Sequence, residues 1–162
     1  MMVRIVAPHF TAGMVRGGAC APILHYMRAK GWTLRQIRAY CHDEQGWTME
    51  LIDDEKPEYV ECRGGWATLY RPLIERCERE GYTVGQVKQK FGSMRFYVDL
   101  DHAAGETLPP ELELAIAIAE RASQTVCEWC GGPAKLREHC HYLFTACDTH
   151  HREVISERDA RR

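Results

Sequence analysis

Two pairs of cysteine and histidine residues near the end of the chain constrain its fold more than any other feature. Cys127 and Cys130 form a C-x2-C pair followed by two glycines, and Cys147 and His150 form a C-x2-H pair, with sixteen residues between Cys130 and Cys147. Two ligands at this spacing can hold one metal ion from a tight turn, and thiolates with an imidazole favour zinc over harder cations. The spacing therefore predicts one structural Zn²⁺ in a closed site of four protein ligands: Cys127, Cys130, Cys147 and His150.

Several neighbouring residues are alternative ligands. His151 could replace His150, and Cys140, His139 or His141 could compete for the ion. The C-x2-H pair repeats the spacing of the first pair, which favours His150. An interpretation of the cysteines as unrelated core residues leaves this paired spacing unexplained.

The segment around the ligands has the pattern of a small zinc-binding fold. Ala134–Thr145, between the two pairs, has the length and alternation of a β-hairpin, and Asp148–Arg162 is polar and compatible with a helix. A knuckle, a hairpin and a helix whose first turn carries the last two ligands form a treble-clef zinc finger. We expect this finger over residues 125–162.

Upstream of the finger the pattern predicts an α-β-β-α unit. The helices are expected over Trp66–Arg79, which Gly81 ends, and over Glu111–Ser123, which follows two prolines. Between them Val84–Lys90 and Met94–Leu100 alternate like the strands of a hairpin.

The N-terminal part predicts a smaller mixed α/β module. Thr33 and Gln36 have the spacing of a capping box at the start of a helix. The expected elements are a strand at Val3–Ala7, a strand around Val15, a helix from Pro22 to about Arg28, a helix over Leu34–Cys41 and a strand over Trp47–Ile52.

Together these elements predict an α+β fold with two parts. Residues 1–55 form the small α/β module with a basic helix pair, 56–62 an acidic linker, and 63–162 an α+β domain that ends in the zinc finger.

The net charge of −2 is unevenly distributed, because residues 1–42 contain six basic residues and no acid, whereas 43–61 contain eight acids and one lysine. Such asymmetry favours either an electropositive contact face or mutual neutralisation within the fold.

Composition and segment lengths argue against a membrane or secreted protein. No apolar run approaches the roughly 20 residues of a membrane span, and the first residues lack the pattern of a signal peptide. The eight cysteines are then expected to be reduced, as in a cytoplasmic protein.

Two basic segments are candidate binding surfaces. The strand region supplies Lys88, Lys90, Arg95 and Tyr97, a combination that suits nucleic acid or another contact on its open face. The N-terminal helix pair, with a turn at residues 30–32, resembles a helix-turn-helix, in which Arg35 and Arg38 would reach DNA. A small nucleotide near Gly17-Gly18 is a further open possibility.

A nuclease is a weaker alternative. LFTACDTHHRE resembles the last turn of an HNH motif, with His139 or His141 as its histidine. Only five residues separate His141 from Cys147, however, and no asparagine occurs from Thr125 to the end. The catalytic constellation of that family is therefore incomplete, and we expect a non-enzymatic protein, with a degenerate HNH-type nuclease as the lesser alternative.

A family resemblance covers about Trp66 to His150. KFGSMRFYVD, an acidic apolar helix, CEWCGG and the C-x2-H pair resemble small, largely uncharacterised bacteriophage and prophage accessory proteins. The resemblance implies phage origin, a zinc-binding C-terminal part and the cytoplasm of a bacterial host. Such proteins commonly act by binding, so we expect a host protein as the partner, with a counter-defence or host-takeover role, and a DNA- or RNA-binding regulator as the alternative.

Overall fold

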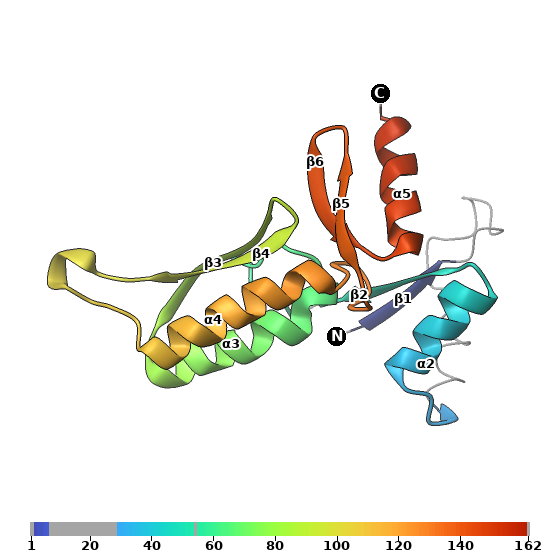
Figure 1. The fold of residues 1–162 in the computed structure, drawn as a ribbon. Helices are drawn as coiled ribbons and strands as arrows, with labels where there is room; N and C mark the ends of the chain where they lie inside the picture. The colour runs from blue at the N-terminus through green and yellow to red at the C-terminus, as the bar shows by residue number, and fades with distance from the viewer. Residues whose placement is uncertain (1, 7–28, 54, 162) are drawn as a thin grey trace.

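The computed structural model describes residues 2–6, 29–53 and 55–161, and within them the protein is an α+β fold with three two-stranded antiparallel sheets. The predicted fold class is confirmed. Figure 1 shows two helices lying along one hairpin, and a second hairpin and the last helix projecting together beside them. No helix in these ranges has the length and apolar character needed to cross a bilayer.

The α-β-β-α unit has the predicted order and nearly the predicted bounds. It consists of α3 (Ala67–Glu80), β3 (Thr83–Lys90), β4 (Ser93–Asp99) and α4 (Pro110–Ala122). Gly81 ends α3 in a left-handed conformation with φ 83°, which glycine adopts without a Cβ penalty. The first hydrophobic core lies between the helices and the hairpin and includes Trp66, Tyr70, Val87, Met94 and Leu112.

Other segments cover both edges of this hairpin. On one side Glu61 donates its backbone N–H to Val87 O, and Val87 donates to Tyr59 O. On the other side Met94 donates its backbone N–H to Ser123 Oγ at 2.8 Å, so the end of α4 covers β4. Residues 59–61, within the predicted acidic linker 56–62, thus pair with β3, and Val60 is buried in the first core.

The N-terminal part begins with β1 (Met2–Val6), which pairs antiparallel with β2 (Thr48–Ile52). Thr33 and Gln36 form the predicted capping box of α2 (Leu34–Ala39), and a π-helical turn (Tyr40–Glu44) continues the helix. The predicted strand around Val15 and the helix from Pro22 lie outside the described residues.

The finger has the predicted knuckle-hairpin-helix order. Its hairpin consists of β5 (Lys135–His139) and β6 (Tyr142–Ala146), and α5 (Asp148–Asp159) follows. The second hydrophobic core joins this finger to the N-terminal part, because it combines side chains from both. Its members include Ile37, Met49 and Leu51 from residues 37–51 and Trp129, Phe144 and Val154 from residues 127–154. The domain boundaries at 55 and 63 stay a prediction.

Candidate metal centre

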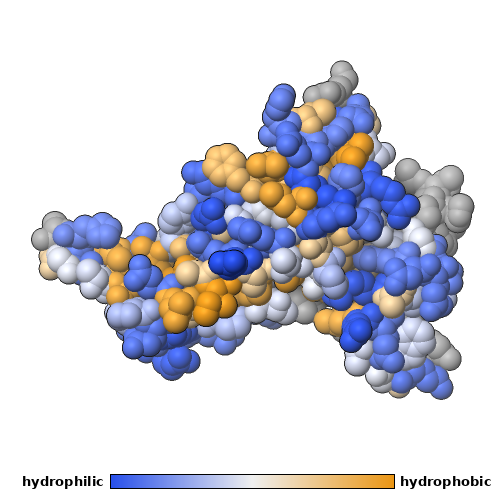
Figure 2. Space-filling model, viewed as in Figure 1, coloured by the Kyte–Doolittle hydropathy of each residue, from blue (hydrophilic) through white to orange (hydrophobic). Residues whose placement is uncertain are grey.

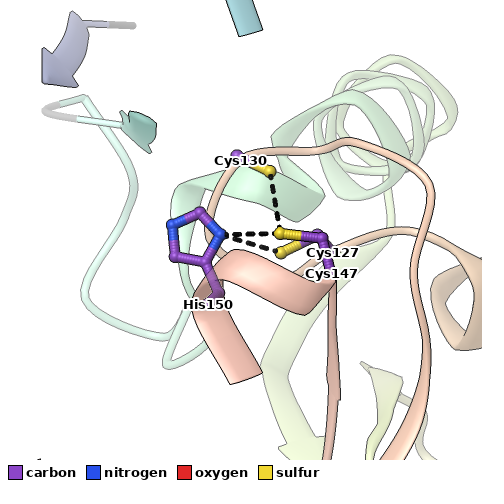
Figure 3. A group of neighbouring side chains, drawn as sticks. All are labelled: Cys127, Cys130, Cys147 and His150. Atoms are coloured by element: carbon purple, nitrogen blue, oxygen red, sulfur yellow. Dashed lines mark hydrogen bonds between the residues drawn. The ribbon is translucent and has the colours of Figure 1, made fainter. Parts of the chain in front are cut away.

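The four predicted ligands come together where the knuckle meets the start of α5 (Figure 3). Their ligand atoms all lie within 4.8 Å of one another. The Nδ1 atom of His150 is 3.1 Å from Cys147 Sγ and 3.5 Å from Cys127 Sγ, and Cys130 Sγ is 4.0 Å from Cys147 Sγ. Cys127, Cys130 and His150 are fully buried. The cluster could therefore hold a metal ion.

The backbone around the first two cysteines forms a tight turn. Gly131, with φ 65°, donates its N–H to Cys127 O at 2.8 Å, and Cys127 donates its own N–H to Gly132 O at 2.7 Å. An isolated bridge between Val126 and Pro133 closes the loop. These contacts direct both thiols to the inside of the turn, as the glycine pair after Cys130 predicts.

Distant segments hold this knuckle from outside. Leu51 in β2 donates its N–H to Trp129 O at 2.8 Å, and Gly65 donates to Glu128 O at 2.8 Å. A Cβ on Gly65 would collide with the carbonyl oxygens of Cys127 and Glu128, so this position requires glycine. Sequence reasoning missed Gly65 and Leu51, because neither is near the ligands in the chain and neither belongs to a motif.

The electrostatics of the cluster depend on its thiols. Burial, with hydrogen bonds to Cys130 and Cys147, raises the pKa of Cys127, whereas hydrogen bonds from Cys127 and Cys130 lower the pKa of Cys147. Burial disfavours a charged His150, but hydrogen bonds to Cys130 and Cys147 outweigh burial and raise its pKa to about 9. These directions favour a thiolate at Cys147 beside a protonated His150, and a bound cation would take the place of the imidazole proton.

The other side of the His150 ring faces polar groups. Its Nε2 is buried without a hydrogen-bond partner among the described residues. A carboxylate oxygen of Glu50, one of Glu153 and a ring nitrogen of His150 lie within 4.8 Å of one another. Trp129 stacks on the ring, with centroids 5.8 Å apart. Metal-bound histidines usually donate their second N–H to such a carboxylate, so the surroundings of His150 suit a ligand role.

The alternative ligands lie elsewhere. His139 and Cys140 are at the turn between β5 and β6, beside Asp159 at the end of α5, and His141 is fully exposed there. His151, although adjacent to His150, packs its ring 5.9 Å from the Phe144 ring. His139 and Cys140 are thus grouped with Asp159 and not with the four predicted ligands.

The candidate binding residues fall into two separate groups. On the β3–β4 hairpin Lys88 lies opposite Arg95, and Lys88 Nζ is 5.2 Å from the centroid of the Tyr97 ring, so these three share one face. Lys90 lies at the end of β3, its Nζ 5.6 Å from the centroid of the Phe91 ring.

The second group consists of the two arginines of the N-terminal helix, Arg35 and Arg38. Arg35 is exposed on α2, whereas Arg38 donates from Nη2 to Cys130 O at 2.7 Å. Arg38 therefore supports the knuckle, a role that its position in a basic helix did not reveal. The first helix of the predicted helix-turn-helix and the Gly17-Gly18 segment lie outside the described residues.

Fold and site together define an α+β protein with a treble-clef arrangement and a Cys₃His cluster that could hold a metal ion. Comparisons with protein family models, with curated proteins and with solved structures found no match. The resemblance to phage accessory proteins therefore stays a prediction from the sequence motifs.

Proposed function

We propose that this is a non-enzymatic binding protein, completed by one structural zinc ion, that binds a host protein through the exposed face of α4. Phage origin and a counter-defence or host-takeover role belong to this proposal through the sequence resemblance alone. The exposed face of α4 is the observation on which the choice of a protein partner depends.

The donor set supports zinc as the metal. Three thiolates and one imidazole suit Zn²⁺, and two sulfurs bound tetrahedrally at 2.3 Å from zinc lie about 3.8 Å apart. The separation of 4.0 Å between Cys130 Sγ and Cys147 Sγ is close to that value. Four protein ligands leave no position for an activated water, which supports a structural role. Protein purified without chelator or added metal should contain one zinc per chain, and Cys130→Ser should lose it.

The exposed face of α4 carries apolar side chains one helical turn apart. Leu114 is 61% exposed and Ile118 is 60% exposed, whereas Leu112 and Ile116, on the opposite face, are buried in the first core. Figure 2 shows hydrophobic surface over this part of the molecule. Residues at i and i+4 on one helix face are the pattern by which an amphipathic helix binds a partner's helix or groove. Full burial of both side chains would contribute about 3–6 kcal/mol to such a contact.

Charges at the two ends of α4 define the partner further. Glu111 and Glu113 lie in its first turn and Arg121 in its last. A partner helix running antiparallel should therefore carry apolar residues at the same spacing, a basic residue opposite the glutamates and an acid opposite Arg121. A second copy of this chain also satisfies this description, so self-association is an outcome that the experiment must separate.

The test is capture from a bacterial lysate with tagged protein, followed by binding of the purified partner. Leu114→Asp with Ile118→Asp should abolish capture. Leu136→Asp, at an exposed leucine on β5 that is 51% accessible, is the matched control and should retain it. A partner that binds both variants equally contradicts the proposed surface, and a dimer abolished only by the α4 variant assigns the surface to a second copy.

A nucleic-acid partner is the second candidate, because Lys88, Arg95 and Tyr97 share one open face. Glu120 Oε2 lies 3.8 Å from Arg95 Nη1 and reduces the positive charge there. A mobility-shift assay at two salt concentrations tests this candidate. Salt-sensitive binding that Lys88→Ala with Arg95→Ala removes would favour it. Arg35→Ala tests the helix pair in the same assay, because Arg35 is exposed whereas Arg38→Ala would also remove the hydrogen bond to Cys130 O.

A further inference from the structure

The turn between β5 and β6 has an unusual composition for its backbone. Cys140 and His141 are its two central residues, with φ of 50° and 60°. Two-residue hairpin turns with both central residues at positive φ strongly prefer asparagine, aspartate and glycine, because a Cβ is unfavourable in this conformation. A cysteine and a histidine therefore occupy positions where the backbone disfavours them, and strain of this kind concentrates at functional sites.

Metal-binding groups meet at this turn. His139 Nε2 lies 2.8 Å from Asp159 Oδ1 and 3.5 Å from Cys140 Sγ. The three ligand atoms all lie within 4.8 Å of one another. They come from two elements, since His139 and Cys140 are on the hairpin and Asp159 is the last residue of α5. Their convergence thus depends on the packing of the helix against the hairpin.

We propose that His139, Cys140 and Asp159 form a second divalent-cation site, selective for zinc-like ions, with its fourth position open to water. One nitrogen, one sulfur and one carboxylate oxygen are ligands of borderline-soft cations such as Zn²⁺. A thiolate and a carboxylate together balance the charge of a divalent ion, and the histidine binds as neutral imidazole. Only the side chain of His139 is largely covered, whereas Cys140 and Asp159 are exposed. The ion can therefore exchange with solvent.

This site is distinct from the structural cluster. The strand β6, five residues long, separates the turn from Cys147, a distance of about 16 Å at the usual rise per residue. One ion cannot bridge that distance. The two sites differ in kind as well, because the structural cluster is buried with four protein ligands and the turn site is exposed with three.

An ion at the turn would fasten the C-terminal end of α5 to the hairpin, as the structural ion fastens its first turn. Residues 157–161 should then become more ordered when the second ion binds. Zinc concentration would thereby control the end of the finger without affecting its core.

The experiment is a titration of the full chain, already carrying its structural zinc, with Co²⁺ in the presence of a non-thiol reductant. The wild type should bind one further equivalent with a sulfur-to-metal charge-transfer band, and hydrogen exchange at residues 157–161 should slow. Cys140→Ser should abolish the band, and it and Asp159→Asn should each weaken the second binding event at least tenfold. Retained structural zinc shows that the variants are folded.

His141→Ala is the matched control, because His141 lies in the same turn, is fully exposed and is outside the cluster. It should bind the second ion like the wild type. Absence of a second equivalent in the wild type, or a second equivalent unaffected by Cys140→Ser, would overturn the site. A loss in His141→Ala as large as in Cys140→Ser would overturn the assigned ligands.

Discussion

Asp53 is the buried charge that connects the N-terminal part to the first core. Its carboxylate follows β2, accepts a hydrogen bond from Tyr70 Oη at 2.6 Å and forms an ion pair with Arg71, both in α3. Burial alone would raise the pKa of this carboxyl, but the hydrogen bonds from Arg71 and Tyr70 outweigh it, so the pKa lies below the usual 3.8. The folded protein therefore stabilises the ionised carboxylate of Asp53 relative to its protonated form.

Asp53→Asn should lower the free energy of unfolding by about 1–3 kcal/mol at pH 7, because Tyr70 and Arg71 lose a charged acceptor. A carboxyl whose folded pKa is lowered stabilises the fold above its unfolded pKa, and this contribution is lost as the pH falls through the folded pKa. The difference between wild type and variant in urea unfolding should thus be constant from pH 7 to about 5 and shrink below 3.8. A difference that grows on acidification would contradict this assignment.

Gly65 is the residue whose size sets how closely η2 (Gly64–Trp66) approaches the knuckle. Gly65→Ala would force the backbone away from Cys127 and Glu128, and such overpacking typically costs about 1–3 kcal/mol. We expect lower stability together with a lower zinc affinity in a chelator competition assay. Gly46→Ala is the control for zinc affinity: its φ of 63° disfavours alanine and lowers stability, but no atom lies within 4 Å of the added Cβ. Equal zinc affinity in the two variants would show that the close approach is unimportant.

At the scale of elements, a buried hydroxyl at the end of α4 holds β4, next to the hydrogen bond from Phe96 N–H to Glu120 Oε1 at 2.9 Å. Ser123 Oγ accepts from Met94 N–H and donates to Glu120 O, and both Ser123 and Met94 are buried. Ser123→Ala should cost about 1–3 kcal/mol of unfolding free energy, because it leaves a buried N–H unsatisfied. Thr125→Ala, which removes an exposed bond to Ala122 O, should stay within about 0.5 kcal/mol. A similar loss of unfolding free energy in the two variants, measured by urea unfolding, would show that the buried Ser123 bond contributes no more than an exposed one.

The elements themselves were predictable because their signals are local. The Thr33–Gln36 capping box, the glycine after α3 and the alternation of β3 and β4 each depend on a few neighbouring residues. The ligand cluster was predictable for the same reason, since two pairs with fixed spacing each form one turn.

Contacts between distant segments gave no such signal. The sequence did not reveal that residues 59–61 pair with β3, or that Arg38 bonds to the knuckle, because each contact depends on how separate elements pack. Asp159 likewise comes near His139 only because α5 packs beside the β5–β6 hairpin and extends as far as its turn. The contacts of residues 59–61, within the predicted linker, and of Arg38, in the predicted recognition helix, are of this kind.

At the scale of the whole molecule, the two cores differ in their relation to the proposed metal site. The first core takes its buried residues from positions 60–119, all outside the knuckle and finger. The second includes Cys127 and Cys130 themselves, with Ile37 and Met49 from the N-terminal part. Structural zinc sites bind with about 10–16 kcal/mol, comparable to or above the total stability of a typical domain. Removing the ion should therefore disorder the second core and with it the N-terminal part.

Native-state hydrogen exchange with and without a zinc chelator tests this dependence. On chelation, amides in α2, β2 and β6 should lose protection together, although α2 and β2 precede the nearest ligand by more than 70 residues. Amides in α3 and α4 should keep theirs, because Tyr70, Met94 and Leu112 belong to the first core, whose buried residues all precede the finger. Cys130→Ser should reproduce the pattern without chelator. Loss of protection confined to residues 127–159 would show that the N-terminal part folds without the metal. Loss of protection throughout the chain would show that the two cores form one cooperative unit. Either result would contradict the prediction that the second core alone depends on the metal.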